Sequence, residues 1–220
     1  MSDRRTSGEP LSLVIPVKET WRAKSRLALD PAVRPLVARR VALATTQAAL
    51  DATAVGAVWV VTRDQQVAAL VRELGALVVP EVGVSGLNAA ADLGRRAALD
   101  SRPHAPVGIL VADLPLLRSA DLDLAVAEFR SHGEPMRVSD HHDVGTTLLV
   151  QGPRDWPGIG FGGRSAELHL RLGYRPWAAA PDGLRRDLDT LDDLALVRAR
   201  SDDTARTLRD LVPRLGPASV

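Results

Sequence analysis

The feature that most constrains the fold of this chain is the alternation of short apolar runs with helix-like segments over its first 130 residues. The apolar runs are bounded by Gly, Pro or Asp, as buried strands are, and the segments between them carry apolar residues at helical spacing. Asp64 and Asn88 stand where helix N-caps belong. This order predicts an α/β fold with a mostly parallel central sheet flanked by helices. We expect strands at 11–17, 57–62, 77–80 and 107–112, and helices at 35–50, 65–74, 88–99 and 122–130.

The remainder of the chain is less regular. A length of 220 residues suits one well-filled α/β domain, and neither an internal repeat nor a long linker divides the sequence. We therefore expect one domain at 11–215, preceded by a disordered tail at 1–10. Within the second half we expect a strand at 146–150, a short helix at 166–172 and helices at 190–200 and 204–211.

Composition excludes several classes of protein. The chain contains no cysteine, so disulfides and thiolate chemistry are excluded. A net charge of +1 predicts no general attraction to nucleic acid or to an anionic membrane. No segment approaches the roughly 20 apolar residues of a membrane-spanning helix, and the polar start lacks the apolar core of a signal peptide. We therefore expect a cytoplasmic protein that binds neither nucleic acid nor membrane.

A cluster of cations follows the first expected strand. Ligands of an open parallel sheet bind beyond the carboxyl ends of its strands, and Lys18, Lys24 and Arg26 lie there within nine positions. Such a cluster can hold a triphosphate and offset the charge that develops in phosphoryl transfer. A solvated basic loop is the alternative, and we assign Arg22 to it. The place after the first strand favours phosphate binding for the other three, although no Walker A loop is present.

Two acidic segments predict a metal site. Asp113 ends the fourth expected strand, where a carboxylate can bind Mg²⁺, although a turn or helix-capping role is an equal alternative. Asp187 and Asp189 would share one face of an extended segment, with Leu188 pointing inward. Two such carboxylates could complete the site with Asp113. The neighbouring residues Thr190, Asp192 and Asp193 have instead the pattern of a helix cap with an acidic first turn.

Two glycine-containing loops could hold an anionic substrate. Glycine lets a backbone approach a ligand closely, and hydroxyl and amide groups donate to carboxylate or phosphate oxygens. Ser165 also begins an expected helix and could be a plain N-cap. Adjacent histidines at 141–142 favour a solvated loop over a metal site, and His169 shows no evident partner. The loops are Gly145-Thr146-Thr147 and Phe161-Gly162-Gly163-Arg164-Ser165.

Seven pieces of the sequence, taken in order, carry a resemblance to a known family. They are IPVK (15–18), AKSRL (23–27), GLNAA (86–90), ADLPLL (112–117), VGTTLLV (144–150), FGGRSAELH (161–169) and RRDLDTLDDL (185–194). In these pieces the chain resembles the 2-phospho-L-lactate/phosphoenolpyruvate guanylyltransferases of coenzyme F420 biosynthesis, known as CofC or FbiD. The resemblance covers residues 11 to about 198.

The resemblance implies a GT-A-like nucleotidyltransferase fold that uses Mg²⁺. It implies transfer of GMP from GTP to phosphoenolpyruvate, with release of diphosphate and formation of enolpyruvyl-diphospho-guanosine. The phosphate of the acid would attack the α-phosphorus of GTP without a covalent enzyme intermediate. The implied roles are GTP phosphates at Lys18, Lys24 and Arg26, guanosine at Ser85 and Asn88, metal at Asp113, Asp187 and Asp189, and the acid at Thr146, Thr147, Gly162 and Ser165. Lys18, Lys24 and Asp113 would carry the catalysis.

Several alternatives stay open at this point. The acid could equally be 2-phospho-L-lactate or 3-phospho-D-glycerate, which have similar charge and size. Arg164 departs from the family, where a smaller residue is expected, and could add an anion contact or point to solvent. Another nucleotidyltransferase of the same fold would carry a Gly-rich loop after the first strand, and a non-catalytic nucleotide-binding module would not need three carboxylates. A homodimer and a hand-over of product to the next transferase of the pathway also stay open.

Overall fold

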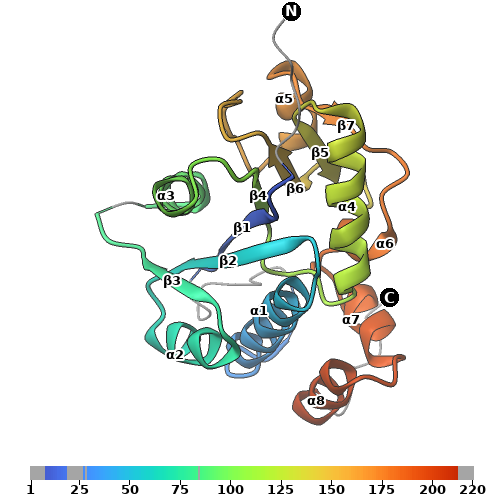
Figure 1. The fold of residues 1–220 in the computed structure, drawn as a ribbon. Coiled ribbons are helices and arrows are strands. Elements are labelled where there is room, and N and C mark those ends of the chain that lie inside the picture. The colour runs from blue at the N-terminus through green and yellow to red at the C-terminus, as the bar shows by residue number, and fades with distance from the viewer. Residues whose placement is uncertain (1–7, 19–26, 28, 84, 213–220) are drawn as a thin grey trace, which may run out of the picture.

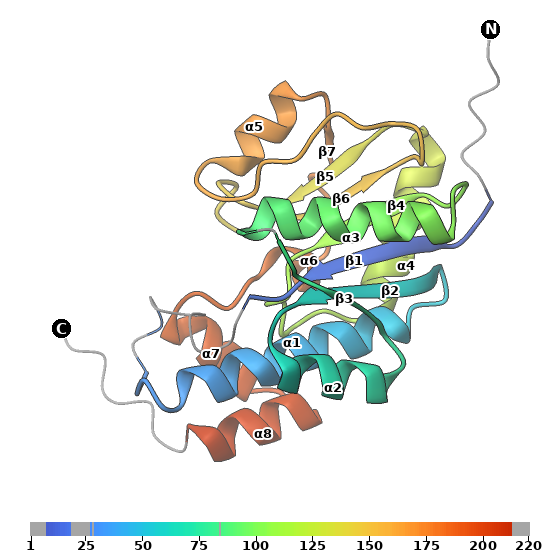
Figure 2. The same ribbon diagram turned by 90° about the vertical axis from the view of Figure 1, so that its left-hand side faces the viewer.

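A computed structural model of the chain describes residues 8–18, 27, 29–83 and 85–212. In this part of the chain seven strands form one sheet with the order β3-β2-β1-β4-β6-β5-β7. Helices cover both faces, as Figures 1 and 2 show. The strands are β1 (Leu11–Pro16), β2 (Val55–Thr62), β3 (Leu77–Pro80), β4 (Val107–Leu110), β5 (Met136–Ser139), β6 (Thr146–Gln151) and β7 (Arg175–Pro176). The helices are α1 (Arg34–Leu50), α2 (Gln65–Leu74), α3 (Leu87–Ser101), α4 (Ser119–His132), α5 (Ser165–Arg171), α6 (Asp182–Arg185), α7 (Leu191–Arg198) and α8 (Asp203–Leu211).

The sheet is mostly parallel, as predicted. Strand β1 pairs in parallel with β2 and with β4, and β2 pairs in parallel with β3. Strand β6 is the exception, because it runs antiparallel to both of its neighbours, β4 and β5. The carboxyl ends of β1, β2, β3 and β4 therefore meet at one edge of the sheet, where ligands of open α/β sheets bind.

Alternate residues of β1 build the two sides of the core. Leu11, Leu13 and Ile15 belong to a cluster with residues of α1, α2 and α4, whereas Val14 faces α3. This division follows from the period of two along a strand. Helix α3 packs closely on the sheet because Gly94 leaves room that a Cβ atom would fill, where it would overlap methyl carbons of Val14 and Val61.

The two predicted helix caps have different outcomes. The Asp64 prediction is confirmed, because its carboxylate accepts hydrogen bonds from the backbone N–H groups of Gln66 and Val67. The Asn88 prediction is wrong. Helix α3 begins at Leu87, one residue earlier, and its N-cap is Gly86 with a φ of 92°. Glycine adopts this backbone conformation at no steric cost.

The C-terminal helices α7 and α8 pack against the first helix of the chain, α1. Leu194 and Val197 of α7 and Leu208 of α8 pack in one buried cluster with Val37 and Val41 of α1. Leu188, in the segment before α7, is fully buried in the same cluster. This packing fixes where the acidic segment at 187–189 lies. Among the described residues, none of the helices has the length and apolar character needed to cross a membrane.

Candidate active site

Two adjoining pockets open at the carboxyl end of β1. The larger has a volume of about 710 Å³ and the smaller about 270 Å³. They share Pro16, Val17, Lys18 and Leu87. The smaller pocket is further lined by Arg63, Glu81, Ser85, Gly86 and Ala90. The larger extends over four other segments, whose lining residues include Asp113, Asp140, His142, Thr146, Gly162, Ser165, Asp187 and Asp189.

Three carboxylates converge in the larger pocket. Asp113, Asp187 and Asp189 each place one carboxylate oxygen within 4.8 Å of the others. A backbone hydrogen bond joins the loop that carries Asp113 to the segment at 187–189, because the N–H of Leu188 donates to the C=O of Asp113 over 3.0 Å. Leu188 points into the core and is fully buried, so Asp187 and Asp189 share the opposite face, as their alternation suggested. Carboxylate oxygens are the ligands that hard divalent cations prefer.

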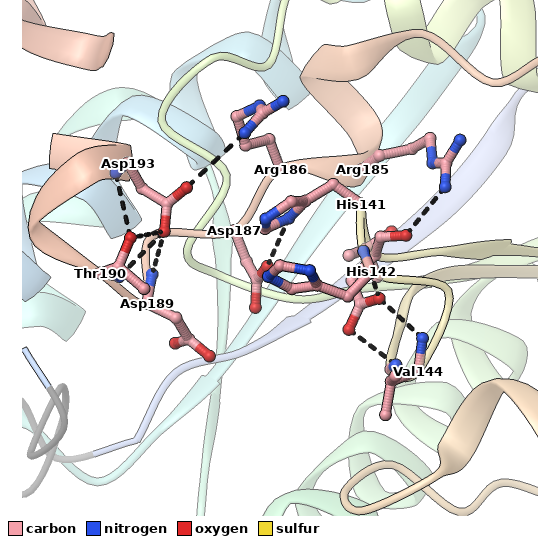
Figure 3. A network of polar contacts seen from close by, with 12 residues as sticks. His141, His142, Val144, Arg185, Arg186, Asp187, Asp189, Thr190 and Asp193 are labelled. Carbon is pink, nitrogen blue, oxygen red and sulfur yellow. Dashed lines mark hydrogen bonds and ion pairs between the residues drawn. The ribbon is translucent and has the colours of Figure 1, made fainter. Parts of the chain in front are cut away.

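The first turn of α7 anchors one end of this acidic segment. Thr190 is the N-cap and forms a capping box with Asp193, whose Oδ2 accepts hydrogen bonds from the N–H and the hydroxyl of Thr190 (Figure 3). The N–H of Asp189 donates to the same oxygen over 3.3 Å. Burial raises the pKa of Asp193, but these hydrogen bonds lower it further, and the net pKa lies below the ordinary value. Asp193 is thus used by the helix start and fixes the backbone of Asp189.

The loop between β5 and β6 brings a histidine to the carboxylates. Asp140 organises the loop, because its carboxylate accepts hydrogen bonds from the N–H groups of His142, Val144 and Gly145. His141 is half-buried, and its Nδ1 lies 3.9 Å from Oδ1 of Asp187 (Figure 3). The pattern of two adjacent histidines did not predict this contact, since nothing in the local sequence indicates that residue 187 lies nearby.

The predicted acid-binding residues fall into two groups. Thr146 and Ser165 are buried at the wall of the larger pocket, and Gly162 lines it with a φ of 104°. The Oγ of Ser165 is buried and has no hydrogen-bond partner among the described residues. Thr147 is placed apart from them, because neighbouring residues of β6 face opposite sides and its hydroxyl donates to the C=O of Val138.

His169 is a functional candidate that sequence reasoning missed. It is fully buried on α5, one helical turn after Ser165. Its Nδ1 lies 2.8 Å from Oγ1 of Thr146, and its Nε2 accepts a hydrogen bond of 3.1 Å from the N–H of Gly160. Burial, with a smaller effect from the charge of Arg137, lowers its pKa from 6.5 to about 4. The one signal for it in the sequence is its spacing of four from Ser165, which places both on one face of the helix.

Asn88 and Arg164 have partners other than those first considered. The side chain of Asn88 accepts from the N–H of Phe161 over 2.7 Å and donates to the C=O of the same residue over 3.2 Å. It therefore fastens the glycine loop at 160–163 to α3. Arg164 is exposed and pairs with Glu167, with 2.9 Å between Nε and Oε2, which favours the solvent-facing alternative. Ser85 lines the smaller pocket.

Of the three cations predicted to bind phosphate, Lys18 lies in the described part of the chain. Lys18 is exposed and lines both pockets. Lys24 and Arg26, together with Arg22, lie outside the described residues.

Comparison with known proteins places this chain in a family. Residues 11–170 match the family described as "Guanylyl transferase CofC like". The chain belongs to the CofC-like guanylyl transferases. It is 43% identical over 185 residues to the phosphoenolpyruvate guanylyltransferase of Thermomonospora curvata, covering 83% of this chain and 81% of that one. It is 41% identical over 190 residues to the enzyme of the same name from Streptomyces scabiei, covering 83% and 88%.

A solved structure supports the fold of this CofC-like chain. A protein from Desulfovibrio desulfuricans, described as a nucleotide-diphospho-sugar transferase, superposes with a TM-score of 0.68 at 14% identity, covering 92% of this chain and 95% of that one. The predicted GT-A-like nucleotidyltransferase fold is therefore confirmed. The family match ends before Asp187 and Asp189, and only the three-dimensional structure shows that these two residues join Asp113.

Proposed function

We propose that this CofC-like chain transfers GMP from GTP to phosphoenolpyruvate and releases diphosphate. The observation that carries the proposal is the convergence of Asp113, Asp187 and Asp189 in a pocket that also contains Lys18 and the acid-binding candidates Thr146 and Ser165. Relatives that bear the name phosphoenolpyruvate guanylyltransferase cover more than four fifths of the chain, which supports this acid over the other two.

The smaller pocket is our candidate for the guanosine. Lys18 stands at the junction of the two pockets, where the phosphates of a nucleotide held between them would pass. Lys24 and Arg26 are proposed to add further phosphate contacts, and Ser85 lies on the guanosine side. Asn88 lies between Leu87 and Ala90, which both line this pocket, and we propose that it borders the nucleoside and acts through its hydrogen bond with Phe161.

Glu81 gives the smaller pocket a means of choosing guanine. Its side chain is 9% exposed and is oriented by Arg63, with 3.1 Å between Oε1 and Nη2. A carboxylate only accepts hydrogen bonds, and guanine presents the N2 amino donor that adenine lacks. Glu81→Gln should therefore reduce the preference for GTP over ATP.

Thr146, Ser165 and the positive-φ glycine Gly162 are proposed to hold the phosphorylated acid. The hydroxyls of Thr146 and Ser165 are buried in the pocket wall, and hydroxyl donors suit carboxylate and phosphate oxygens. The removal of water from such a wall strengthens each of these contacts. Thr147 acts in this arrangement through β5 and not by direct contact.

The acidic cluster fits a divalent cation, which we propose to be Mg²⁺. Three carboxylate oxygens within 4.8 Å of one another form an all-oxygen donor set. When bound, Mg²⁺ would neutralise charge on the phosphate oxygens of the reactants. The backbone hydrogen bond from Leu188 to Asp113 and the capping box of α7 hold the carboxylates in place before any ligand arrives.

In this reaction the phosphate of the acid is itself the nucleophile. The protein therefore has to orient the two reactants and offset the charge of the phosphates, and it needs no nucleophilic side chain. A phosphate oxygen of the acid forms a bond to the α-phosphorus of GTP, and the bond between the α-phosphorus and the bridging oxygen breaks. The electron pair leaves with diphosphate, whose charge Lys18 helps to offset. Positioning of two reactants in one site converts a bimolecular step into an effectively unimolecular one.

Diphosphate release tests the proposal directly. Purified protein with Mg²⁺ should release diphosphate from GTP only when phosphoenolpyruvate is present, and less with 2-phospho-L-lactate or 3-phospho-D-glycerate. ATP, CTP and UTP should be poorer donors than GTP. Equal turnover with all four nucleotides would refute the choice of GTP, and GTP binding without diphosphate release would favour a non-catalytic nucleotide-binding module.

A further inference from the structure

A buried relay of three groups lies behind the acid side of the larger pocket. It runs from the N–H of Gly160 to Nε2 of His169 over 3.1 Å, and from Nδ1 of His169 to Oγ1 of Thr146 over 2.8 Å. The His169 ring is fully buried and is held edge-on by the rings of Phe161 and Tyr174, at centroid distances of 5.4 and 5.5 Å. Both ring nitrogens are therefore used, and the ring is fixed in one orientation.

The chemistry of the partners fixes where the proton of the imidazole lies. A backbone N–H can only donate, so Nε2 must accept and carries no proton. A neutral imidazole has one proton, which must then be on Nδ1. Nδ1 therefore donates to the hydroxyl oxygen of Thr146. The burial of the ring keeps it neutral, since its pKa is lowered to about 4.

Because Thr146 accepts a hydrogen bond from His169, the proton of its own hydroxyl is not used in that contact and can be donated to a ligand. A threonine hydroxyl has one proton and two lone pairs, and His169 occupies one lone pair. Thr146 is buried in the wall of the larger pocket, together with Ser165, whose hydroxyl has no partner among the described residues. Two hydroxyl donors at the wall of one pocket are suited to an oxyanion.

We infer that His169 is a positioning residue that orients the Thr146 hydroxyl so that its proton is free to donate to the phosphorylated acid. The inference rests on the proposed function for the identity of that acid. His169 also fixes the backbone at Gly160, while Asn88 fixes it at Phe161. The glycine loop at 160–163 is therefore held in place beside β6 at the wall of the larger pocket. The effect of His169 is therefore on the acid and not on GTP.

Two amide substitutions separate the two hydrogen bonds of the ring. In His169→Asn the amide group takes the place of Nδ1 and can still donate to Thr146. In His169→Gln the amide group reaches the place of Nε2, so the bond to Gly160 is kept and the bond to Thr146 is lost. We expect KM for phosphoenolpyruvate to rise about tenfold in His169→Gln, with KM for GTP unchanged, and to rise much less in His169→Asn.

A double-mutant cycle with Thr146 links the effect to the hydroxyl. Thr146→Val removes the hydroxyl at nearly the same volume and should reproduce the KM of His169→Gln, whereas Thr146→Ser keeps the hydroxyl and should raise the KM for the acid less than Thr146→Val does. The double variant Thr146→Val/His169→Gln should be no worse than Thr146→Val alone, because the two residues act through one hydrogen bond. Additive effects, or an unchanged KM for the acid in His169→Gln, would overturn the inference.

A spectroscopic measurement keeps the inference testable without any substrate. ¹⁵N NMR of histidine-labelled protein should show His169 as the neutral tautomer protonated on Nδ1 from pH 5 to pH 8. The Nε2-protonated tautomer would overturn the inference even if every variant misfolds. Absence of diphosphate release by the wild type would instead refute the proposed function and leave the tautomer result to decide the role of His169.

Discussion

At the scale of single residues, the site depends on a few side chains whose surroundings decide what they can do. Lys18 is the only charged residue among the described residues that line both pockets. It is exposed and reaches the junction where nucleotide phosphates are proposed to pass. A flexible ammonium at such a place acts as a point charge on phosphate.

Lys18→Ala should weaken GTP binding or turnover, because it removes a charge-assisted contact with phosphate. The expected loss is about 1.5–3 kcal/mol, measured as kcat/KM for GTP in the diphosphate assay. Arg72→Ala is the matched control, since Arg72 is an exposed cation in the last turn of α2 that lines neither pocket. Equal kinetics of the two variants would show that Lys18 is merely solvated.

The lowered pKa of His169 leads to a prediction about how the free energy of unfolding depends on pH. Its pKa lies near 4 in the folded protein and near 6.5 when the ring is free, so the folded state binds fewer protons between these values. The stability that the neutral ring contributes to the folded state is therefore fully present above about pH 6.5 and is lost as the pH falls toward 4. Urea unfolding of His169→Asn should show a smaller loss of stability over this range than the wild type. His104→Asn, at an exposed turn, should keep the wild-type slope.

Individual residues also show where sequence reasoning ends. The face shared by Asp187 and Asp189 was predictable, because alternation in an extended segment is a local property. The partners of Asn88 and His169 were not, since Phe161 and Thr146 lie 73 and 23 positions away and only the fold brings them close. The local sequence around Asn88 is typical of a helix N-cap, but in the folded chain its side chain bonds the backbone of Phe161 instead.

At the scale of elements, the periodic helices and the strongly apolar strands were predictable, whereas the short strands that contain polar residues or only two residues were not. Helices α1 and α2 begin within one residue of their predicted starts, and β3 matches its prediction. Strand β5 was missed because it has four residues, two of them polar, and β7 has only two residues. Such strands exist because β6 and β5 supply hydrogen bonds to them, which no local pattern records.

The contact between α3 and the sheet provides a test at this scale. Gly94→Ala would normally favour a helix by about 1 kcal/mol. Here the added methyl would overlap Val14 of β1 and Val61 of β2, both of them buried core residues. We expect a net loss of about 1–3 kcal/mol in the free energy of unfolding, measured with urea. Gly8→Ala, which meets no atom within 4 Å, should be neutral, and a stabilised Gly94→Ala would contradict this packing.

At the scale of the whole molecule, the proposed metal site depends on the packing of the C-terminal helices against the first helix of the chain. Helices α7 and α8 pack on α1, and the same buried cluster contains Leu188 between two of the three carboxylates. Asp113 comes from the loop after β4, at the carboxyl edge of the parallel strands. The site therefore exists only when the C-terminal helices are docked, which the sequence could not show.

Metal binding should follow from this geometry even without turnover. Mn²⁺, used as a spectroscopic substitute for Mg²⁺, should bind the wild type, and Asp187→Asn should weaken that binding about tenfold or more because one carboxylate ligand is lost. Electron paramagnetic resonance of free Mn²⁺ measures the difference. Asp203→Asn, on the exposed first turn of α8, is the control and should bind as the wild type does.

The most direct test of the account is the rate of diphosphate release from GTP and phosphoenolpyruvate by Asp113→Asn. The variant keeps the shape of the side chain and the backbone contact with Leu188, but it removes one charge from the three carboxylates. We predict a fall of at least about a hundredfold with an unchanged melting temperature. Asp192→Asn, at the exposed start of α7, should retain the wild-type rate. A rate for Asp113→Asn near that of the wild type would contradict the proposed active site.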